Sequence, residues 1–125
     1  MNLVDSSAWL EYFADGPNAD FFAPAIEKAR DLLVPTIVLY EVYKRVCQQR
    51  DDHAALEAIS ILQHGRIVDL TASLAAAAAQ TSCDKGLPMA DSIILATARM
   101  ENATIWTQDS DFKGMDRVKF RARKA

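Results

Sequence analysis

Short apolar runs, each too brief to form a helix, alternate along this chain with longer segments of helical periodicity. The apolar runs cover residues 2–4, 32–35, 66–70, 103–107 and 118–120. Between them, apolar side chains recur every three or four positions, which predicts amphipathic helices. Strands that are separated by helices form parallel rather than hairpin pairings. The alternation therefore predicts an α/β fold with a mainly parallel central sheet.

The length and composition set the class of protein. A chain of 125 residues is long enough to bury a sizeable core, and we predict a single domain over residues 1–125. No apolar run reaches the length of a membrane span, and the N-terminus lacks the basic flank of a signal peptide. We therefore expect a cytoplasmic protein with no membrane partner. Cys47 and Cys83 are far apart in sequence and outside any CxxC motif, so we expect reduced core thiols.

Asp5 ends the first apolar run, and helical spacing of apolar residues begins immediately after it. This acid therefore lies where a buried strand turns into a helix that starts at Ser6 or Ser7. In open α/β sheets, ligands bind at this carboxyl end of the strands. Because Asp is also a favoured helix N-cap, Asp5 taken alone fits either a binding or a capping role.

Three later acids are expected at the same edge of the sheet. Asp109 follows the strand predicted at 103–107, and Asp91 lies in the first turn of the helix that precedes that strand. Glu41 follows the strand at 32–35 by about a turn and a half of helix. Together with Asp5, these acids form a predicted cluster of four carboxylates.

Each of the three later acids also has an ordinary structural explanation. Asp91 complements a helix dipole, Glu41 is placed to pair with Arg45 at i+4, and Asp109 suits a turn. Their joint placement is harder to explain, because two unit charges 4–5 Å apart cost about 3–4 kcal/mol at an effective dielectric constant of ~20. A bound cation or shared protons must offset that repulsion.

The composition of the predicted cluster indicates which cation it would hold. A set of oxygen ligands without His or Cys suits a hard, octahedral ion, meaning Mg²⁺ with Mn²⁺ as a substitute. Such ions polarise phosphates and activate a water molecule for attack. The cluster therefore predicts metal-dependent hydrolysis of phosphodiester bonds.

Charge is distributed unevenly along the chain. Residues 113–125, which we call the basic tail, carry six Lys or Arg residues against one Asp, for a local net charge of +5 within a chain of net charge −3. A basic tail on an acidic body suggests a polyanionic partner such as RNA, and the alternative is a solvated tail that only aids solubility. The candidate RNA contacts are Lys119, Arg121, Arg123 and Lys124.

Four stretches that contain the acids form an ordered set. They are Leu3–Trp9, Tyr40–Val42, Ala90–Ala98 and Trp106–Phe112. In order and spacing they resemble the PIN-domain ribonucleases and, more narrowly, the VapC-type toxins of bacterial and archaeal toxin–antitoxin pairs. The resemblance covers essentially the whole chain. It implies a three-layer α/β/α sandwich, a Mg²⁺-dependent endoribonuclease, a cognate VapB-like antitoxin and a homodimer.

The resemblance also assigns roles to individual residues. It maps the acidic residues that bind metal and act in catalysis onto Asp5, Glu41, Asp91 and Asp109. Asp109 stands where many relatives carry either Asn or Asp, and Asp111 is a candidate additional acid. Ser6 and Thr107 match positions that orient the acidic groups by hydrogen bonding. For the antitoxin, Trp9, Phe13 and Phe22 are candidates for the receiving surface, and for at least one of them we expect core packing instead.

Two other functions compete with this interpretation. A catalytically inactive interaction module would keep the fold and the partner but lose the nuclease, and the presence of all four acids argues against it. A receiver-like signalling domain also collects carboxylates at strand ends. It would carry adjacent acids after the first strand and a Lys after the last, whereas Asp5 is followed by serines.

Overall fold

A five-stranded sheet forms the centre of the computed structural model, which describes residues 1–124. The strands are β1 (Asn2–Val4), β2 (Leu32–Pro35), β3 (Arg66–Val68), β4 (Thr104–Thr107) and β5 (Val118–Phe120). Their order across the sheet is β3-β2-β1-β4-β5, and all four pairings are parallel. The first strand is therefore central, with Leu3 in register with Leu33 on one side and Ile105 on the other.

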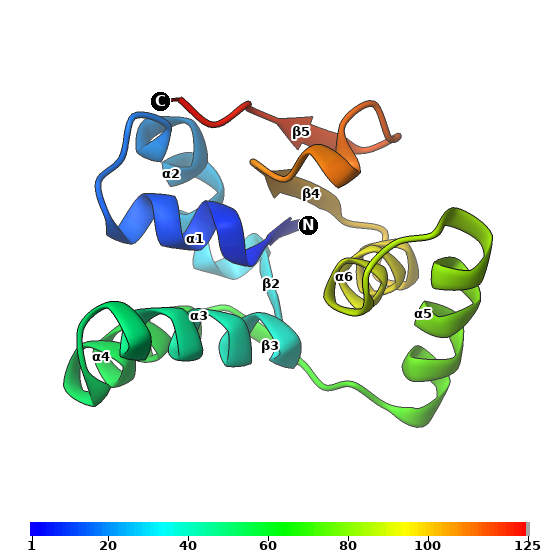
Figure 1. Ribbon diagram of the computed structural model, residues 1–125, viewed down its shortest axis with the longest axis horizontal. Helices are drawn as coiled ribbons and strands as arrows, with labels where there is room; N and C mark the ends of the chain where they lie inside the picture. Colours follow the sequence, from blue (N-terminus) through cyan, green and yellow to red (C-terminus); the bar gives the residue numbers. More distant parts are fainter. Residues whose placement is uncertain (125) are drawn as a thin grey trace.

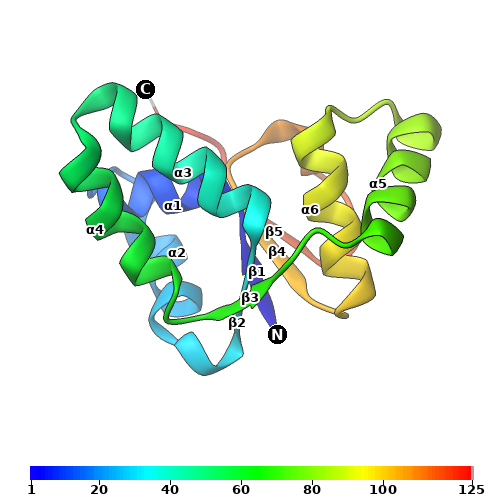
Figure 2. The ribbon, with the colours of Figure 1, turned by 90° about the horizontal axis from the view of Figure 1, so that it is seen from below.

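Helices cover both faces of this sheet. They are α1 (Ser6–Phe13), α2 (Ala19–Glu27), α3 (Thr36–Gln49), α4 (Asp52–Leu62), α5 (Ala72–Lys85) and α6 (Met89–Met100), with short 3₁₀ turns at Ala29–Asp31 and Ser110–Phe112. Figure 2 shows α1 to α4 on one side of the strands and α5 and α6 on the other, while Figure 1 labels each element. The predicted three-layer α/β/α sandwich is confirmed. None of the helices within residues 1–124 has the length and apolar character needed to cross a membrane.

Local sequence signals explain where several helices begin and end. Asp5, Asp51 and Thr71 are N-caps whose side chains accept hydrogen bonds from the backbone N–H three residues later. Gly86 ends α5 with φ of +70°, a conformation that glycine adopts without strain. Pro24 does not mark the start of α2, because this helix begins at Ala19 and contains the proline in its second turn.

The core lies mainly between the sheet and the layer formed by α1 to α4. Trp9 and Phe22 are completely buried there, and the Trp9 ring stacks on Phe13 with 5.6 Å between centroids. Trp9 and Phe22 therefore pack the core and do not form part of a receiving surface. The cysteine prediction is also only partly right, because Cys47 is half-buried and Cys83 is exposed.

Candidate active site

The topology brings the ends of β1 and β4 together at the carboxyl edge of the sheet. These strands are adjacent and parallel, so the residues that follow them emerge side by side. The backbone N–H of Asp5 donates to the Trp106 carbonyl, which extends the pairing by one residue. As a result, Asp5 at the start of α1 faces Thr107 and Asp109 at the end of β4, although more than 100 residues separate them.

Asp5 is held in one position by three hydrogen bonds. Its Oδ1 accepts from the Ser7 hydroxyl at 2.7 Å and from the Ala8 backbone N–H at 3.0 Å, and its Oδ2 accepts from the Thr107 hydroxyl at 2.5 Å. The side chain is 2% exposed. Burial raises the pKa of Asp5 to about 6, against the lowering effect of these three donors. Asp5 thus caps α1 and also presents a fixed carboxylate at the sheet edge.

The two hydroxyls beside Asp5 have defined orientations. The backbone N–H of Asp109 donates to Thr107 Oγ1 at 2.8 Å, and the backbone N–H of Gln108 donates to Ser7 Oγ at 3.2 Å. Because each hydroxyl oxygen already accepts from an N–H, its own proton is free to point at Asp5. Both hydroxyls therefore stabilise the ionised form of this carboxyl.

A second group of carboxylates lies beside Asp5. Asp91 from the first turn of α6, Asp109 and Asp111 each place an oxygen within 4.8 Å of the others. Burial, hydrogen bonding with Asp111 and the negative charge of Asp109 raise the pKa of Asp91 to about 8. Near neutral pH and without a cation, this group of three carboxyls therefore retains a shared proton.

Glu41 reaches the same region from α3. Its Oε1 accepts a hydrogen bond of 2.9 Å from the Ser6 hydroxyl, and no salt bridge to Arg45 forms among residues 1–124. Burial and the charge of Asp109 raise the pKa of Glu41. The charge of Asp109 thus acts on Asp5, on Glu41 and on Asp91. We call these four acids, together with Asp111, the acidic site.

The four predicted acids do converge, and Ser6 and Thr107 do hydrogen-bond to two of them. The closest group of carboxylates includes Asp111 rather than Asp5 or Glu41. Ser7, which holds Asp5 as directly as Thr107 does, was not singled out as a site residue. The sequence did contain a signal for Ser7, because this residue carries a hydroxyl two positions after an acid that ends a strand.

The donor set of the acidic site fits a hard divalent cation. All of its ligand atoms are carboxylate oxygens, and His and Cys are absent from the group found in the described part of the chain. Neither of the two salt bridges within residues 1–124 involves these acids. No Lys or Arg forms an ion pair with these acids in the described part of the chain, and burial together with their mutual repulsion raises the pKa values of Asp5, Glu41 and Asp91.

The basic tail runs along β5 and past the edge of α2. Lys119 lies opposite Trp106, with its Nζ 4.6 Å from a Trp106 ring centroid, and the Arg121 guanidinium lies 4.4 Å from the Phe21 centroid. These two side chains thus cover aromatic rings while remaining exposed, whereas Arg123 and Lys124 are exposed without such a contact. Figure 1 shows the end of the chain beside α2.

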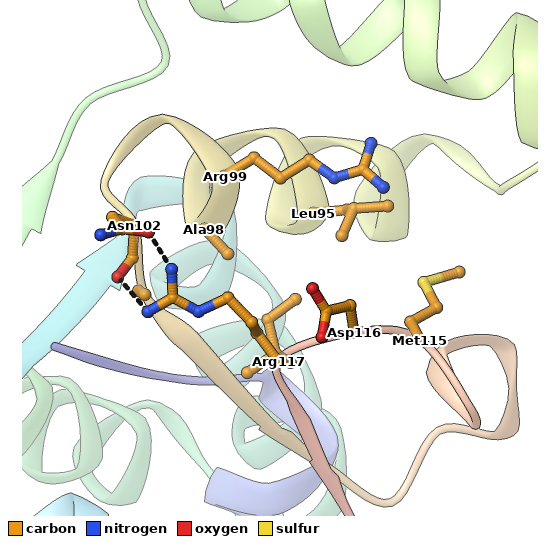
Figure 3. Close-up of a pocket in the computed structure, with 9 residues that line it drawn as sticks. Leu95, Ala98, Arg99, Asn102, Met115, Asp116 and Arg117 are labelled. Atoms are coloured by element: carbon orange, nitrogen blue, oxygen red, sulfur yellow. Dashed lines mark hydrogen bonds between the residues drawn. The ribbon is translucent and has the colours of Figure 1, made fainter.

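A separate cavity of about 230 Å³ lies at the opposite, amino end of the sheet, between α6 and the loop before β5. Figure 3 shows the Arg117 guanidinium there, donating to both the side-chain and the backbone oxygen of Asn102. Asn102 and Arg117 both have positive φ and each lies in a turn. Their hydrogen bonds therefore connect the turn before β4 to the turn before β5. Asp116 is the one carboxylate lining this cavity, which therefore lacks the acids that a metal site needs.

Comparison with known proteins assigns the sequence and the fold to one group. A family model described as the PIN domain matches residues 3–118. Among curated proteins, none matches this sequence. Among solved structures, a toxin–antitoxin complex from Klebsiella pneumoniae contains a chain that is 20% identical, with a TM-score of 0.81 over 95% of this chain and 96% of that chain.

Two further structures have the same fold. VapC20 from Mycobacterium tuberculosis, named a sarcin–ricin loop cleaving toxin, is 21% identical, with a TM-score of 0.80 over 97% of this chain and 99% of that chain. VapBC2 from Rickettsia felis, bound to a DNA fragment from its promoter, is 19% identical, with a TM-score of 0.71 over 97% of both chains.

Proposed function

This chain belongs to the PIN domain family, and we propose that it is a Mg²⁺-dependent endoribonuclease that acts as the toxin of a VapBC-type toxin–antitoxin pair. One observation carries the proposal: four carboxylates converge on a fifth, Asp109, with no Lys or Arg paired to them within residues 1–124. Such a group is costly for a fold unless a cation occupies it. Membership of the PIN domain family leaves no support for a receiver-like signalling domain.

In this proposal the acids of the site hold the cation, and Mn²⁺ is able to replace Mg²⁺. Asp5, Glu41, Asp91 and Asp109 are the proposed metal-binding and catalytic acids, and Asp111 is a further ligand. When bound, the cation polarises the scissile phosphate and makes a water molecule more acidic. Ser7 and Thr107 keep the Asp5 carboxylate in one orientation, and Ser6 does the same for Glu41. The protein thereby provides a site whose ligands need little reorganisation.

The substrate and partner are proposed from the similar structures. The neighbour named a sarcin–ricin loop cleaving toxin supports RNA as the substrate. Neighbours solved as toxin–antitoxin complexes support a VapB-like antitoxin encoded beside this chain. We further propose a homodimer, and we place it in the cytoplasm because its RNA substrate is there.

An apolar groove offers a receiving surface for the antitoxin. It has a volume of about 250 Å³ and lies between α1 and α4, with Leu10, Phe13 and Ile61 among the side chains that line it. Ile61 is 40% exposed, which is high for a large apolar side chain. Of the three aromatic residues proposed for this role from sequence, only Phe13 lines the groove.

A cleavage assay tests the proposed activity. The purified chain is incubated with labelled transfer, ribosomal and messenger RNA in Mg²⁺, in Mn²⁺ or in EDTA. We expect endonucleolytic products with either metal and none in EDTA. Asp5→Asn, which keeps a helix-capping oxygen, should abolish cleavage, and Asp20→Asn, a change at an exposed acid on α2, should not.

The same assay distinguishes the competing interpretation. A chain that binds its antitoxin but cleaves no RNA with either metal would be an inactive interaction module. Cleavage that continues in EDTA and in the Asp5→Asn protein would show that the acidic site is not the catalytic centre.

A further inference from the structure

A groove on α3 opens directly from the acidic site. Its volume is about 350 Å³, and its lining includes Ser6, Tyr40, Glu41, Lys44, Arg45 and Gln48. We call it the α3 groove. From Tyr40 to Gln48 it follows two turns of helix, a length of about 12 Å. Since consecutive phosphates of a stacked strand are about 3.4 Å apart along the axis, the α3 groove is long enough for more than one nucleotide.

The charge along the α3 groove changes sign with distance from the acidic site. Glu41 lies at the end nearest the site, and Lys44 and Arg45 follow one helical turn further on. Neither cation belongs to a salt bridge within the described part of the chain. Both are exposed. The α3 groove therefore presents two unpaired positive charges next to the place where a cation would hold a phosphate.

Tyr40 provides an aromatic surface in the same groove. Its side chain is 60% exposed, whereas Trp9 and Phe22 on the neighbouring helices are completely buried. The Lys44 ammonium lies 5.7 Å from the Tyr40 ring centroid, at the outer limit of a cation–π contact. The ring thus remains available to a ligand, and a positive charge is already beside it. Aromatic rings next to cations are the usual elements of single-stranded nucleic-acid grooves.

We propose that the α3 groove binds the RNA strand that adjoins the scissile phosphate. In this arrangement Tyr40 stacks on a nucleobase, and Lys44 and Arg45 contact the phosphates next to the one held at the acidic site. The inference rests on the proposed nuclease function, and it adds where the substrate lies and that the bound segment is single-stranded. A base inside a duplex has its faces covered by its neighbours and cannot stack on Tyr40.

Charge complementarity favours RNA over a peptide as the occupant. The α3 groove offers one exposed aromatic ring and two cations, and its end at the acidic site suits a metal-bound phosphate. The groove lined by Phe13 and Ile61 is largely apolar, although Gln49, Arg50 and Glu57 also line it, and it suits a protein partner better. The proposed RNA substrate and the proposed antitoxin thus occupy different grooves. Leu10 lines both of these grooves.

Binding of a short RNA tests the α3 groove separately from catalysis. Anisotropy of a fluorescein-labelled octauridylate is measured with the full chain in Ca²⁺ over a range of salt concentrations. We expect Tyr40→Ala to weaken binding about tenfold and Tyr40→Phe to leave it nearly unchanged, because phenylalanine keeps the ring. The double variant Lys44→Gln/Arg45→Gln should reduce the slope of log affinity against log salt by about 1.4, for two lost phosphate contacts. A duplex of the same length should bind equally to wild type and Tyr40→Ala.

Matched controls decide between the outcomes. Lys28→Gln/Arg30→Gln removes the same charge from exposed positions before β2 and should leave the salt slope unchanged. If wild type cleaves RNA in Mg²⁺ but Tyr40→Ala and the Lys44/Arg45 variant bind octauridylate like the wild type, the α3 groove inference is overturned and the proposed function stands. If these variants instead alter only the oligomeric state or antitoxin binding, the groove is a protein interface and the inference is again overturned. If wild type neither binds nor cleaves RNA, both proposals fail.

Discussion

The Thr107 hydroxyl donates a hydrogen bond of 2.5 Å to Asp5 Oδ2 and so joins the end of β4 to the end of β1. The same oxygen accepts from the Asp109 backbone N–H at 2.8 Å. One buried hydroxyl therefore sets the position of Asp5 relative to the loop that carries Asp109 and Asp111. It also lowers the pKa of Asp5, against the larger effect of burial.

Replacing Thr107 should weaken the site without removing an acid. Thr107→Val keeps the shape but deletes the hydroxyl, so the pKa of Asp5 should rise above about 6 in the metal-free protein. The free energy of unfolding at pH 8 should fall by roughly 1–3 kcal/mol, because a buried hydrogen bond to a charged group is lost. Carbon NMR titration of the Asp5 carboxyl and urea denaturation measure the two effects. Thr107→Ser should behave like wild type, and an unchanged Asp5 pKa in Thr107→Val would contradict the assignment.

The stability of the metal-free protein should fall as pH rises. Asp5 and Asp91 have pKa values of about 6 and about 8, both raised from 3.8, and the pKa of Glu41 is also raised. Such groups bind protons more tightly in the folded state, so this stabilisation is complete below about pH 4 and is lost as pH increases through the folded values. Urea denaturation in EDTA should show a declining free energy of unfolding from pH 5 to pH 9. Addition of Mg²⁺ at pH 8 should reverse much of the decline, because the cation replaces the protons.

Asp91→Asn should stabilise the metal-free protein above pH 8. The amide carries no charge, so the variant avoids the repulsion from Asp109 and Asp111 that appears when Asp91 ionises. Because Asp91 is only half-buried, solvent screening reduces the gain to about 1–3 kcal/mol, and lost helix-dipole support reduces it slightly further.

Thermal melts at pH 6 and pH 9, with and without Mg²⁺, test this expectation. Asp91→Asn should gain less from Mg²⁺ than the wild type and should lose nuclease activity. If Asp91 were only a helix-terminal acid, the variant would be slightly less stable than wild type in EDTA at both pH values, and its response to Mg²⁺ would be normal.

The free end of the basic tail should contribute to RNA affinity through charge. Arg123 and Lys124 are exposed and touch no aromatic ring in the described structure, so Arg123→Gln/Lys124→Gln should leave the folded protein unchanged. Filter binding of a labelled RNA at several salt concentrations should give lower affinity and a smaller salt slope than wild type. An identical slope would mean that these residues are only solvated.

Changing Lys119 and Arg121 should have a second effect that Arg123 and Lys124 do not share. Their side chains pack on Trp106 and Phe21, so replacement by Gln should also lower the melting temperature. This lower melting temperature should already be present without added RNA. Equal melting temperatures for the two double variants would show that the aromatic contacts do not stabilise the fold.

The groove between α1 and α4 should control association with the antitoxin. Ile61→Glu places a charge among its apolar lining, so co-purification with the co-expressed antitoxin should fall and growth inhibition by this chain should no longer be relieved. Leu56→Glu is a matched control, because Leu56 is 55% exposed on the same helix but does not line the groove. Relief of toxicity that is equally strong in both variants would place the antitoxin elsewhere.

The order of strands and helices follows from the sequence because it depends on local periodicity. Each apolar run of three to five residues became a strand, and each capping signal such as Asp51 or Thr71 marked a helix start. Asp5 and Asp109 come directly after apolar runs, and parallel strands present their carboxyl ends at one edge. Their location at one edge of the sheet was therefore predictable, whereas their convergence also required β1 and β4 to be neighbours, which the sequence did not show.

Other features depend on distances between segments far apart in the chain, and only the tertiary structure decided them. The pairing of β4 with β5 places Lys119 over Trp106, and the packing of α2 against this edge places Phe21 beneath Arg121. Burial of Trp9 and Phe22 likewise depends on which helix faces meet. Periodicity shows that a residue lies on an apolar face, but it does not show whether that face is covered by a sheet, by another helix or by solvent.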